Sequence, residues 1–406
     1  MITRKDIEVL AIGDINNDRD RIDPSLMNQF LRLPWQVYST RELLAKNWVP
    51  PNLKESRFVL SRNNPFFEHA CARLFLAMHE EKPVGRIAAI VDHAHNDIHH
   101  EHTGFFGFYE SFCDPHVPQI LFPVVEDWLR EQGMSIVRGP LNPSVNDECG
   151  LLIDGFHLPP TMMMPYNPSY YVNQIEEQGF AIAKTLCSYL LTPDVISSNT
   201  KVRRLTEIPR KKGLMARVLC LDDLAGELAK VKEIYNDAWS PNYGFVPMTD
   251  KEIDSMAKRL ADVIDPNLIV FVEKEQDGKA PEPIAFLLGV PNYNVALKHM
   301  DGKDGFFEKL KFIYYGGFPA NLYHGRLRKI YSGKINAYRV MVMGVKKEHQ
   351  KGASTAMMLQ LFQKNLKPGS SVDMSWTLED NIDINRTIEG LGGIVYKLHR
   401  IYEKAI

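Results

Sequence analysis

Apolar and polar positions follow a repeated strand–helix order in the second half of the chain. Its apolar or alternating runs predict strands at residues 215–221, 268–273, 283–290, 338–345, 372–379 and 395–404. Apolar residues three or four positions apart predict helices at residues 224–238, 249–263, 354–366 and 383–391. The polar turn after 273 indicates a hairpin, and residues 291–334 are expected to form an irregular insertion. The pattern is typical of an α/β (α+β) protein.

The first half repeats this order with little residue identity. A hairpin is predicted over 73–92, followed by the elements that correspond to the later strands and helices. These are strands at 104–111, 135–140 and 183–191, a helix at 118–132 and a short helix ending within 173–180. The polar, basic stretch 195–213 predicts a linker. The order therefore indicates an internal duplication, with domains at 1–200 and 201–406.

Composition narrows the class of protein. The 406 residues are 45% hydrophobic and 24% charged, with a formal net charge of −2, which is typical of a globular protein. This charge argues against a nucleic-acid partner and against a broad electrostatic footprint for a membrane surface, and leaves a local charged patch open. No apolar run approaches the roughly 20 residues of a membrane span, and the first residues do not look like a signal peptide. Five scattered cysteines form no CxxC pair. We expect a reduced, cytoplasmic protein without an integral membrane segment.

The stretch MVMGVKKEHQKGASTAMM, residues 341–358, joins a predicted strand to a predicted helix. Backbone N–H groups in such a turn and the positive end of the helix dipole point the same way, which favours an anion. Small residues from Gly352 to Thr355 allow close approach to the backbone, and Lys346, Lys347 and Lys351 add positive charge. The alternative is a plain, basic strand-to-helix connection.

This turn, the flanking strands and helix, Asn381 and the C-terminal 391–393 (LGG) together resemble the Gcn5-related N-acetyltransferase (GNAT) superfamily. The resemblance implies two tandem GNAT-like domains, each a mixed, mostly antiparallel twisted sheet flanked by helices. It implies an acyl-CoA-binding second domain, with the thioester between splayed strands 338–345 and 372–379, and a degenerate first domain on the acceptor side. The co-substrate would be acetyl-CoA or a longer acyl-CoA. The implied coenzyme contacts are Met343, Gly344, Val345, Gln350, Lys351, Gly352, Ala353, Ser354, Thr355, Asn381 and Asn385.

The sequence departs from the family pattern at two places. The family turn reads Gln/Arg-x-x-Gly-x-Gly/Ala. Counting from Gln350 puts Ala353 at the first glycine, whereas counting from His349 puts Ser354 at the second. Ile388 stands where the family often has a tyrosine that protonates the leaving thiolate.

Direct acyl transfer requires a neutral amine near the thioester, a group that accepts its proton, and a polarised carbonyl. Glu379 and Asp380, at the end of one predicted strand, and Glu110, at the end of the matching strand, are candidate bases. Tyr402 is a candidate proton donor to the thiolate, as is Tyr338. The alternative for each is a surface carboxylate or a packed tyrosine.

Residues 138–171 form a long Pro-, Tyr- and Met-rich segment. Its GP-NPS-N…GF…PP…MMPYNP pattern is similar to that of a bacterial group of acyl-CoA N-acyltransferases. Long loops without regular structure are often functional, so we expect an acceptor-side wall suited to an amphipathic ligand. The alternative is a rigid loop packed between domains. The candidate substrate contacts are Asn146, Tyr166, Asn167, Tyr170, Trp239 and Tyr243.

Five histidines, His93, His95, His99, His100 and His102, cluster within ten residues. Imidazoles bind metals, but no helix is predicted there to fix their geometry, so we expect a solvated loop and no metal.

The leading hypothesis is an acyl-CoA-dependent N-acyltransferase, in which an amine attacks the thioester directly. The acceptor would be a small-molecule or lipid-like amine, and the protein a monomer or homodimer. Two alternatives remain: a Fem-type transferase that uses aminoacyl-tRNA, and a non-catalytic acyl-CoA-binding protein.

Overall fold

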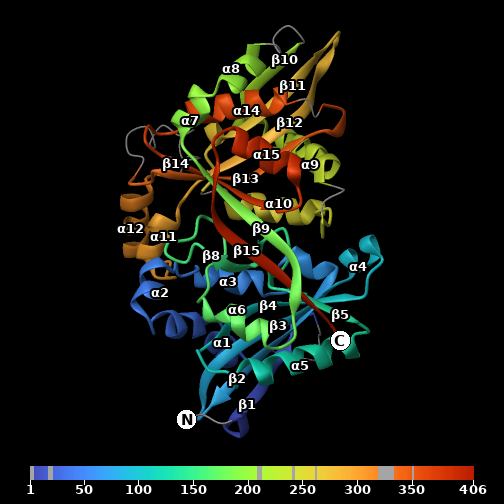
Figure 1. Ribbon diagram of the computed structural model, residues 1–406, viewed down its shortest axis with the longest axis vertical. Coiled ribbons are helices and arrows are strands. Elements are labelled where there is room, and N and C mark those ends of the chain that lie inside the picture. Colours follow the sequence, from blue (N-terminus) through green and yellow to red (C-terminus); the bar gives the residue numbers. More distant parts are fainter. Residues whose placement is uncertain are drawn as a thin grey trace. The chain divides into compact units, whose positions relative to one another are not determined.

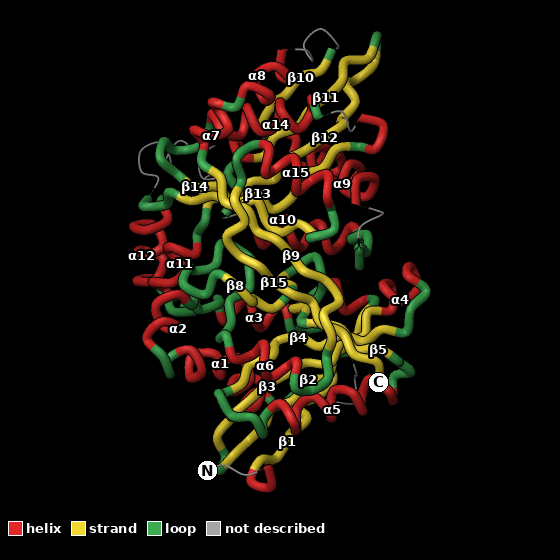
Figure 2. The backbone as a smooth tube through the Cα atoms, viewed as in Figure 1, coloured by secondary structure: helices red, strands yellow, loops and turns green. Residues whose placement is uncertain are grey.

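The computed structural model describes residues 4–16, 22–207, 213–239, 243–260, 263–318, 333–349 and 352–406. They form two compact units (Figure 1). The first unit contains Met1–Leu186, Met300–Asp304 and Lys397–Ile406, and the second contains Cys187–His299 and Gly305–Tyr396. Helices and strands are mixed in both (Figure 2), which confirms the predicted α/β class.

The first unit is built on a sheet in which β4 and β5 run parallel and the other paired neighbours run antiparallel. The spatial order is β1 (Ile7–Asp14), β2 (Ala70–His79), β3 (Lys82–Asp92), β4 (Thr103–Ser111), β5 (Ile136–Gly139) and β15 (Ile394–Ala405). Short strands follow β5: β6 (Leu141–Asn142), β7 (Glu148–Cys149) and β8 (Leu151–Asp154). The helices are α1 (Pro24–Tyr38), α2 (Glu42–Asn47), α3 (Leu53–Val59), α4 (His93–His99), α5 (Pro118–Glu131) and α6 (Tyr170–Glu176).

Alternation along β3 explains how this sheet is covered on both faces. Side chains two residues apart on a strand share a face. Ile87 lies in one core cluster with Leu121 and Phe122 of α5. The neighbouring Arg86 points to the other face, where its guanidinium lies over the Phe30 ring of α1. The long helices α1 and α5 therefore pack on opposite faces.

The second unit repeats this design. Its sheet has the order β10 (Leu214–Val218), β11 (Ile269–Gln276), β12 (Lys279–Pro291), β13 (Ala337–Val345), β14 (Ser371–Leu378) and β9 (Ala181–Leu191), whose Cys187–Leu191 part lies in this unit. Its helices are α7 (Pro193–Ser198), α8 (Thr200–Glu207), α9 (Leu224–Trp239), α10 (Asp250–Leu260), α11 (Asn294–Met300), α12 (Phe306–Gly316), α14 (Ala353–Lys364) and α15 (Ile382–Gly390). β13 and β14 are the parallel pair.

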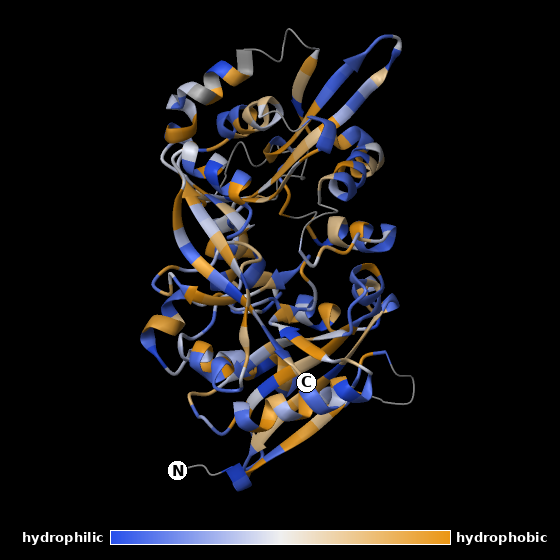
Figure 3. Cartoon of the chain, turned by 45° about the vertical axis from the view of Figure 1, so that its right-hand side comes forward, coloured by the Kyte–Doolittle hydropathy of each residue, from blue (hydrophilic) through white to orange (hydrophobic). Residues whose placement is uncertain are grey.

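Two long helices also cover the faces of this second sheet. Ile234 of α9 shares a core cluster with Phe271 and Phe286. On the other face, Gly289 of β12 leaves room for the ring of Phe362 on α14, because a side-chain carbon at 289 would overlap that ring. The far end of the β11–β12 hairpin is polar and exposed (Figure 3).

Several predictions from the sequence need correction. The expected linker 195–213 contains α7 and α8, and the expected irregular insertion 291–334 contains α11 and α12; residues 208–212 and 319–332 lie outside the described part. The His-rich loop begins with α4, whose first turn is capped by the Asp92 carboxylate accepting from the His95 N–H (3.2 Å). β1 and α1–α3 had no predicted counterparts.

The compact units also differ from the expected boundary at 200/201. The C-terminal strand β15 pairs with β5 of the first unit, with Tyr402 opposite Gly139. In turn, the second unit begins within β9, at Cys187. Each sheet therefore includes a strand that the sequence order assigned to the other half.

Among the described residues, no helix combines the length and apolar character needed to cross a bilayer.

Candidate active site

The parallel strands of the second unit separate partway along their length. β13 and β14 pair from Ala337 opposite Ser371 to Val340 opposite Met374. Both strands continue, to Val345 and Leu378, but the described ladder between them ends there. β13 stays paired with β12 up to Val345, with an irregularity in register near Met341. Two parallel strands that part in this way leave one edge of β13 open.

Burial changes at the same point. Tyr338, Arg339 and Val340 are buried, whereas the next three residues of β13 are half-buried. β14 shows the same change, from buried at 372–375 to half-buried at 376–378. Below the opening, the buried Arg339 guanidinium donates to the Ser375 hydroxyl (3.0 Å) and ties the two strands together. The two strands are therefore tightly packed where they pair and become more exposed only after the ladder ends.

The two ends of the turn that follows β13 differ in whether a side chain of the protein accepts from a backbone N–H. Gly352 is the N-cap of α14 with φ of 71°. A glycine carries no side chain that could cap the first amides of the helix. Ser354 is buried, and Ala353 and Thr355 are half-buried. At the start of the turn, the Lys347 N–H donates to Asp237 of α9 (2.9 Å). An anion bound here would therefore sit at the α14 end of the turn.

The predicted contacts after β14 divide into exposed and structural residues. Glu379 and Asp380 are exposed in a turn, and Asn381 is half-buried as the N-cap residue of α15. The Asn385 amide donates to the carbonyls of Leu378 (2.9 Å) and Glu379 (3.1 Å). Asn385 therefore positions the strand-to-helix turn that carries both candidate bases.

The remaining predicted contacts lie on β13, at the end of α9 and in the segments that precede α10 and α14. Gln350 and Lys351 lie outside the described residues, as does the side chain of Trp239. Tyr243 is half-buried in the loop before α10. Met343 and Val345 are half-buried on the open part of β13, and Gly344 between them is buried.

In the first unit, the corresponding opening is filled by the chain itself. β4 and β5 pair only from Thr103 to Phe105. Beyond that point the Asn142 side chain accepts from the Phe108 N–H (2.6 Å). A methyl group on Gly107 would overlap the Leu141 carbonyl oxygen. No pattern in the sequence indicates this contact, because Asn142 is only one of several polar residues in the Pro-rich segment.

Beside this filled opening lies a buried acid–base cluster. Glu110 sits opposite Arg86 on the next strand, with 3.7 Å between carboxylate Oε1 and guanidinium Nη2. The Tyr171 hydroxyl donates to Glu110 (2.7 Å) and accepts from the Ser111 N–H (2.8 Å). Arg86 also donates to the Phe30 carbonyl (2.6 Å). Arg86 was missed, although a charged residue within the apolar run PVGRIAAIV was the available signal.

Burial raises the pKa of Glu110 to about 7, against the opposing effects of Arg86 and the Tyr171 hydrogen bond. Burial also raises the pKa of Tyr171 well above its usual value, helped by the Glu110 charge. The tyrosine therefore stays a proton donor, and the carboxyl group can exchange a proton near neutral pH. A buried carboxyl with such a pKa is a chemical candidate, and equally a structural one.

The structure shows what the predicted loop residues contact. Asn167 accepts from the Leu152 N–H (2.7 Å) and donates to the Leu152 carbonyl (3.1 Å). Tyr166 donates to the Phe156 carbonyl (2.9 Å), and Tyr170 donates to the Ser111 carbonyl (2.8 Å). Asn146, half-buried, lies in a turn where its N–H donates to the Ser144 hydroxyl (3.2 Å). These contacts hold the loop in the first unit, and substrate contact by these residues stays a prediction.

Tyr402 belongs to the core of the first unit. It is fully buried on β15, and its hydroxyl donates to Glu176 (3.0 Å). Burial raises the pKa of Tyr402 to about 12. The structure thus places it beside Glu176 in the first unit, whereas the β13–α14 turn belongs to the second.

The histidine cluster forms no metal site within the described residues. His95 is buried, and its Nε2 lies 3.3 Å from a Glu101 oxygen. Burial lowers the pKa of His95, against the opposing effect of Glu101.

Comparisons with solved structures identify the fold. The chain matches a tandem GNAT protein from the clavulanic acid biosynthesis pathway with a TM-score of 0.53, at 10% identity over 98% of both chains. A probable N-acyltransferase from Enterococcus faecalis V583 matches with a TM-score of 0.51, at 8% identity over 98% of this chain and 73% of that one. The fold is therefore a tandem GNAT fold, as the resemblance implied.

Two curated proteins are similar in sequence over nearly the whole length. Bacterial ceramide synthase from Caulobacter vibrioides is 34% identical over 392 residues, covering 94% of this chain and 96% of that protein. Protein YghO from Escherichia coli K12 is 31% identical over 386 residues, covering 94% and 93%. No protein-family model matches the sequence. The chain belongs to the protein family that contains bacterial ceramide synthase and YghO.

Proposed function

We propose that the protein is an acyl-CoA-dependent N-acyltransferase whose acceptor is a long-chain amino alcohol. The observation that carries this proposal is the separation of β13 from β14, followed by a turn that enters α14 at the N-cap glycine Gly352. Family membership supports the acceptor class, since a ceramide is an N-acylated long-chain amino alcohol. Asp237 occupies the Lys347 N–H and brings negative charge to the start of the turn, so we expect an anion to bind at the α14 amides instead.

In the proposed reaction, the amine nitrogen attacks the thioester carbonyl, a C–N bond forms and the C–S bond breaks. The amine loses a proton to a base, and the coenzyme thiolate gains one to become a free thiol. Backbone N–H groups on the open edge of β13, near Gly344, would polarise the carbonyl. The gain over the uncatalysed reaction comes chiefly from holding amine and thioester together.

The test combines the purified chain with acyl-CoAs of several lengths and a long-chain 2-amino-1,3-diol. We expect the N-acylated product by mass spectrometry, with free thiol released in equal amount. Long-chain amines without the hydroxyl groups, and short water-soluble amines, serve as acceptor controls. No amide with any acyl-CoA, together with no thermal stabilisation by coenzyme A, would overturn the proposal and favour an aminoacyl-tRNA-dependent or non-catalytic protein.

The base is assigned by variants in each unit. Glu110→Gln keeps the size of the side chain and removes its proton-accepting charge, and Glu379→Gln with Asp380→Asn does the same at the β14 turn. Turnover that falls at least about a hundredfold with unchanged coenzyme A binding assigns the role, in keeping with general-base contributions. Wild-type turnover in all these variants would leave proton removal to water.

A further inference from the structure

Helix α12 exposes a set of large apolar side chains. Phe306 is 71% exposed, Phe307 72%, Leu310 48% and Tyr314 54%. Their spacing puts all four on one side of the helix, within about 100° of each other. We call these four residues the α12 surface. Aromatic rings exposed together over several residues mark an interaction site more often than scattered single apolar residues do.

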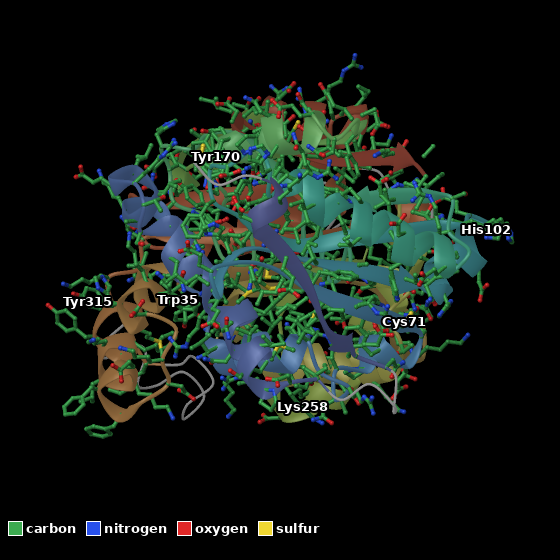
Figure 4. The ribbon with its side chains drawn as sticks, turned by 90° about the horizontal axis from the view of Figure 1, so that it is seen from below. Trp35, Cys71, His102, Tyr170, Lys258 and Tyr315 are labelled. Carbon is green, nitrogen blue, oxygen red and sulfur yellow. The ribbon has the colours of Figure 1, made fainter. Side chains whose placement is uncertain are left out.

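The opposite side of α12 anchors the helix in the second unit. Phe312 stacks on the Tyr293 ring with centroids 5.2 Å apart, and Tyr293 is fully buried. Gly316 brings the end of the helix against Ala296 and Tyr293 of the α11 region. Figure 4 shows Tyr315 at the outer edge of the orange α11–α12 pair. The exposed side chains are thus presented by a fixed helix and are not needed for its packing.

Lysines border the apolar side chains of this surface on both sides. Lys309 and Lys311 are exposed on either side of the apolar stripe, and the Lys334 ammonium lies 4.3 Å from the centre of the Tyr314 ring. The charges of Lys298, Lys311 and Lys334 add to the effect of burial, which lowers the pKa of the nearby His299. Against them on the helix stands Glu308, whose Oε1 lies 3.9 Å from the Lys311 ammonium.

We propose that α12 docks the protein onto an anionic lipid surface. Phe306, Phe307 and Leu310 enter the boundary between headgroups and acyl chains, and the flanking lysines meet lipid phosphates. A lipid surface fits better than a protein partner because an apolar stripe bordered on both sides by lysines is the pattern of interfacial helices. At 11 residues, α12 lies in the interface and does not span it. The proposal does not depend on the proposed acyltransferase activity.

The test is flotation of the full-length protein with vesicles, without substrates. We expect binding to vesicles of phosphatidylcholine with phosphatidylglycerol, weak binding to phosphatidylcholine alone, and release by salt. The double variant Phe306→Glu/Phe307→Glu should lose at least about tenfold in partition coefficient. Lys309→Glu/Lys311→Glu should lose roughly fivefold for each lysine removed.

Matched controls distinguish binding through the α12 surface from nonspecific binding to vesicles. Ile394→Glu changes a side chain that is also 71% exposed, and Lys274→Glu/Lys279→Glu changes two exposed lysines of the β11–β12 hairpin. Both controls should bind vesicles like the wild type. Loss in the controls equal to that in the α12 variants overturns the proposal. So does a wild-type dimer in sedimentation that Phe306→Glu/Phe307→Glu dissociates without any change in vesicle binding, which would assign α12 to self-association.

Discussion

The two parallel strand pairs, β4–β5 in the first unit and β13–β14 in the second, start alike and end differently. Each pair is held by a few residues of parallel ladder before the strands part. In the first unit β4 is buried to its last residue, except for the half-buried Phe108. In the second, β13 becomes half-buried as soon as the ladder stops. One framework therefore supports both a packed core and an open edge.

A very short segment makes this difference. In the first unit, Leu141 and Asn142 return against β4 directly after β5, and the Asn142 side chain supplies the acceptor that β5 no longer provides. In the second unit β14 continues to Leu378, and a turn and α15 follow. Two residues can thus fill the space between the parting strands without altering the sheet. This agrees with our proposal that the second unit, where the space is not filled in this way, binds the acyl-CoA.

The largest expected effect comes from Gly107→Ala. A methyl group there would overlap the Leu141 carbonyl oxygen, so the backbone must move, at a cost of about 3 kcal/mol of unfolding free energy. Gly390→Ala is the control, because a methyl group at 390 meets nothing within 4 Å. Denaturant unfolding of both variants measures the difference. Equal stability would mean that the first opening is not tightly closed.

The next largest effect is on the pH dependence of the unfolding free energy, which should have opposite signs for a buried glutamate in each unit. The folded pKa of Glu110, about 7, is above the usual 4.5, so its contribution to stability is present below pH 4.5 and is lost as pH rises through 7. The stability of the wild type relative to Glu110→Gln should therefore fall by roughly 2–3 kcal/mol between pH 5 and pH 8.

Glu273 in the second unit gives the opposite sign and serves as the control. Burial, the largest single influence, opposes ionisation of Glu273, but the hydrogen bonds and charges of Arg217 and Lys230 together outweigh it and lower the pKa of the carboxyl group. Its contribution is present above pH 4.5 and is lost as pH falls. Relative to Glu273→Gln, the wild type should therefore lose stability on acidification. The same sign for both glutamates would contradict the environments described.

Sequence reasoning reached the local features of both units but not the contacts that distinguish them. Periodicity located β13, α14 and β14 because each is a long element with a clear apolar pattern. The pairing of β15 with β5 joins residues more than 260 positions apart, and no local pattern encodes that choice. Asn142 acts through a contact with Phe108, 34 positions away, and nothing in its neighbours marks it. Arg86 was marked only by being a charged residue within an apolar run, which does not reveal its partners. α12 was missed because aromatic residues that face outward blur the helical period.

A smaller effect is expected at Asn142 itself. Asn142→Ala leaves the half-buried Phe108 N–H without its acceptor, which should cost about 1–2 kcal/mol of unfolding free energy. Asn142→Asp keeps an oxygen in the same place and should retain most of the stability at neutral pH. Thermal unfolding of the pair measures this. If Asn142→Ala also gains a second coenzyme A site in calorimetry, the first unit is closed by this contact alone; if aspartate destabilises as much as alanine, the hydrogen bond is not what holds the segment.

The smallest expected change in free energy lies at the open unit. Gly352 has φ of 71° and, apart from Leu205 at 3.9 Å, a side-chain carbon there would meet nothing. Gly352→Val should therefore add backbone strain and also block approach to the α14 amides, so we expect coenzyme A affinity to fall about tenfold, or about 1.4 kcal/mol. Gly369→Val is the matched control, because Gly369 has φ of 69° and equally open surroundings but lies after α14, at the other end of the helix. Both variants carry the same strain, so unfolding should shift equally in the two while coenzyme A affinity, measured by calorimetry, falls in Gly352→Val alone. An equal loss of affinity in both would show that strain, and not access to the helix amides, governs binding, and the β13–α14 turn would then cease to distinguish the open unit from the closed one.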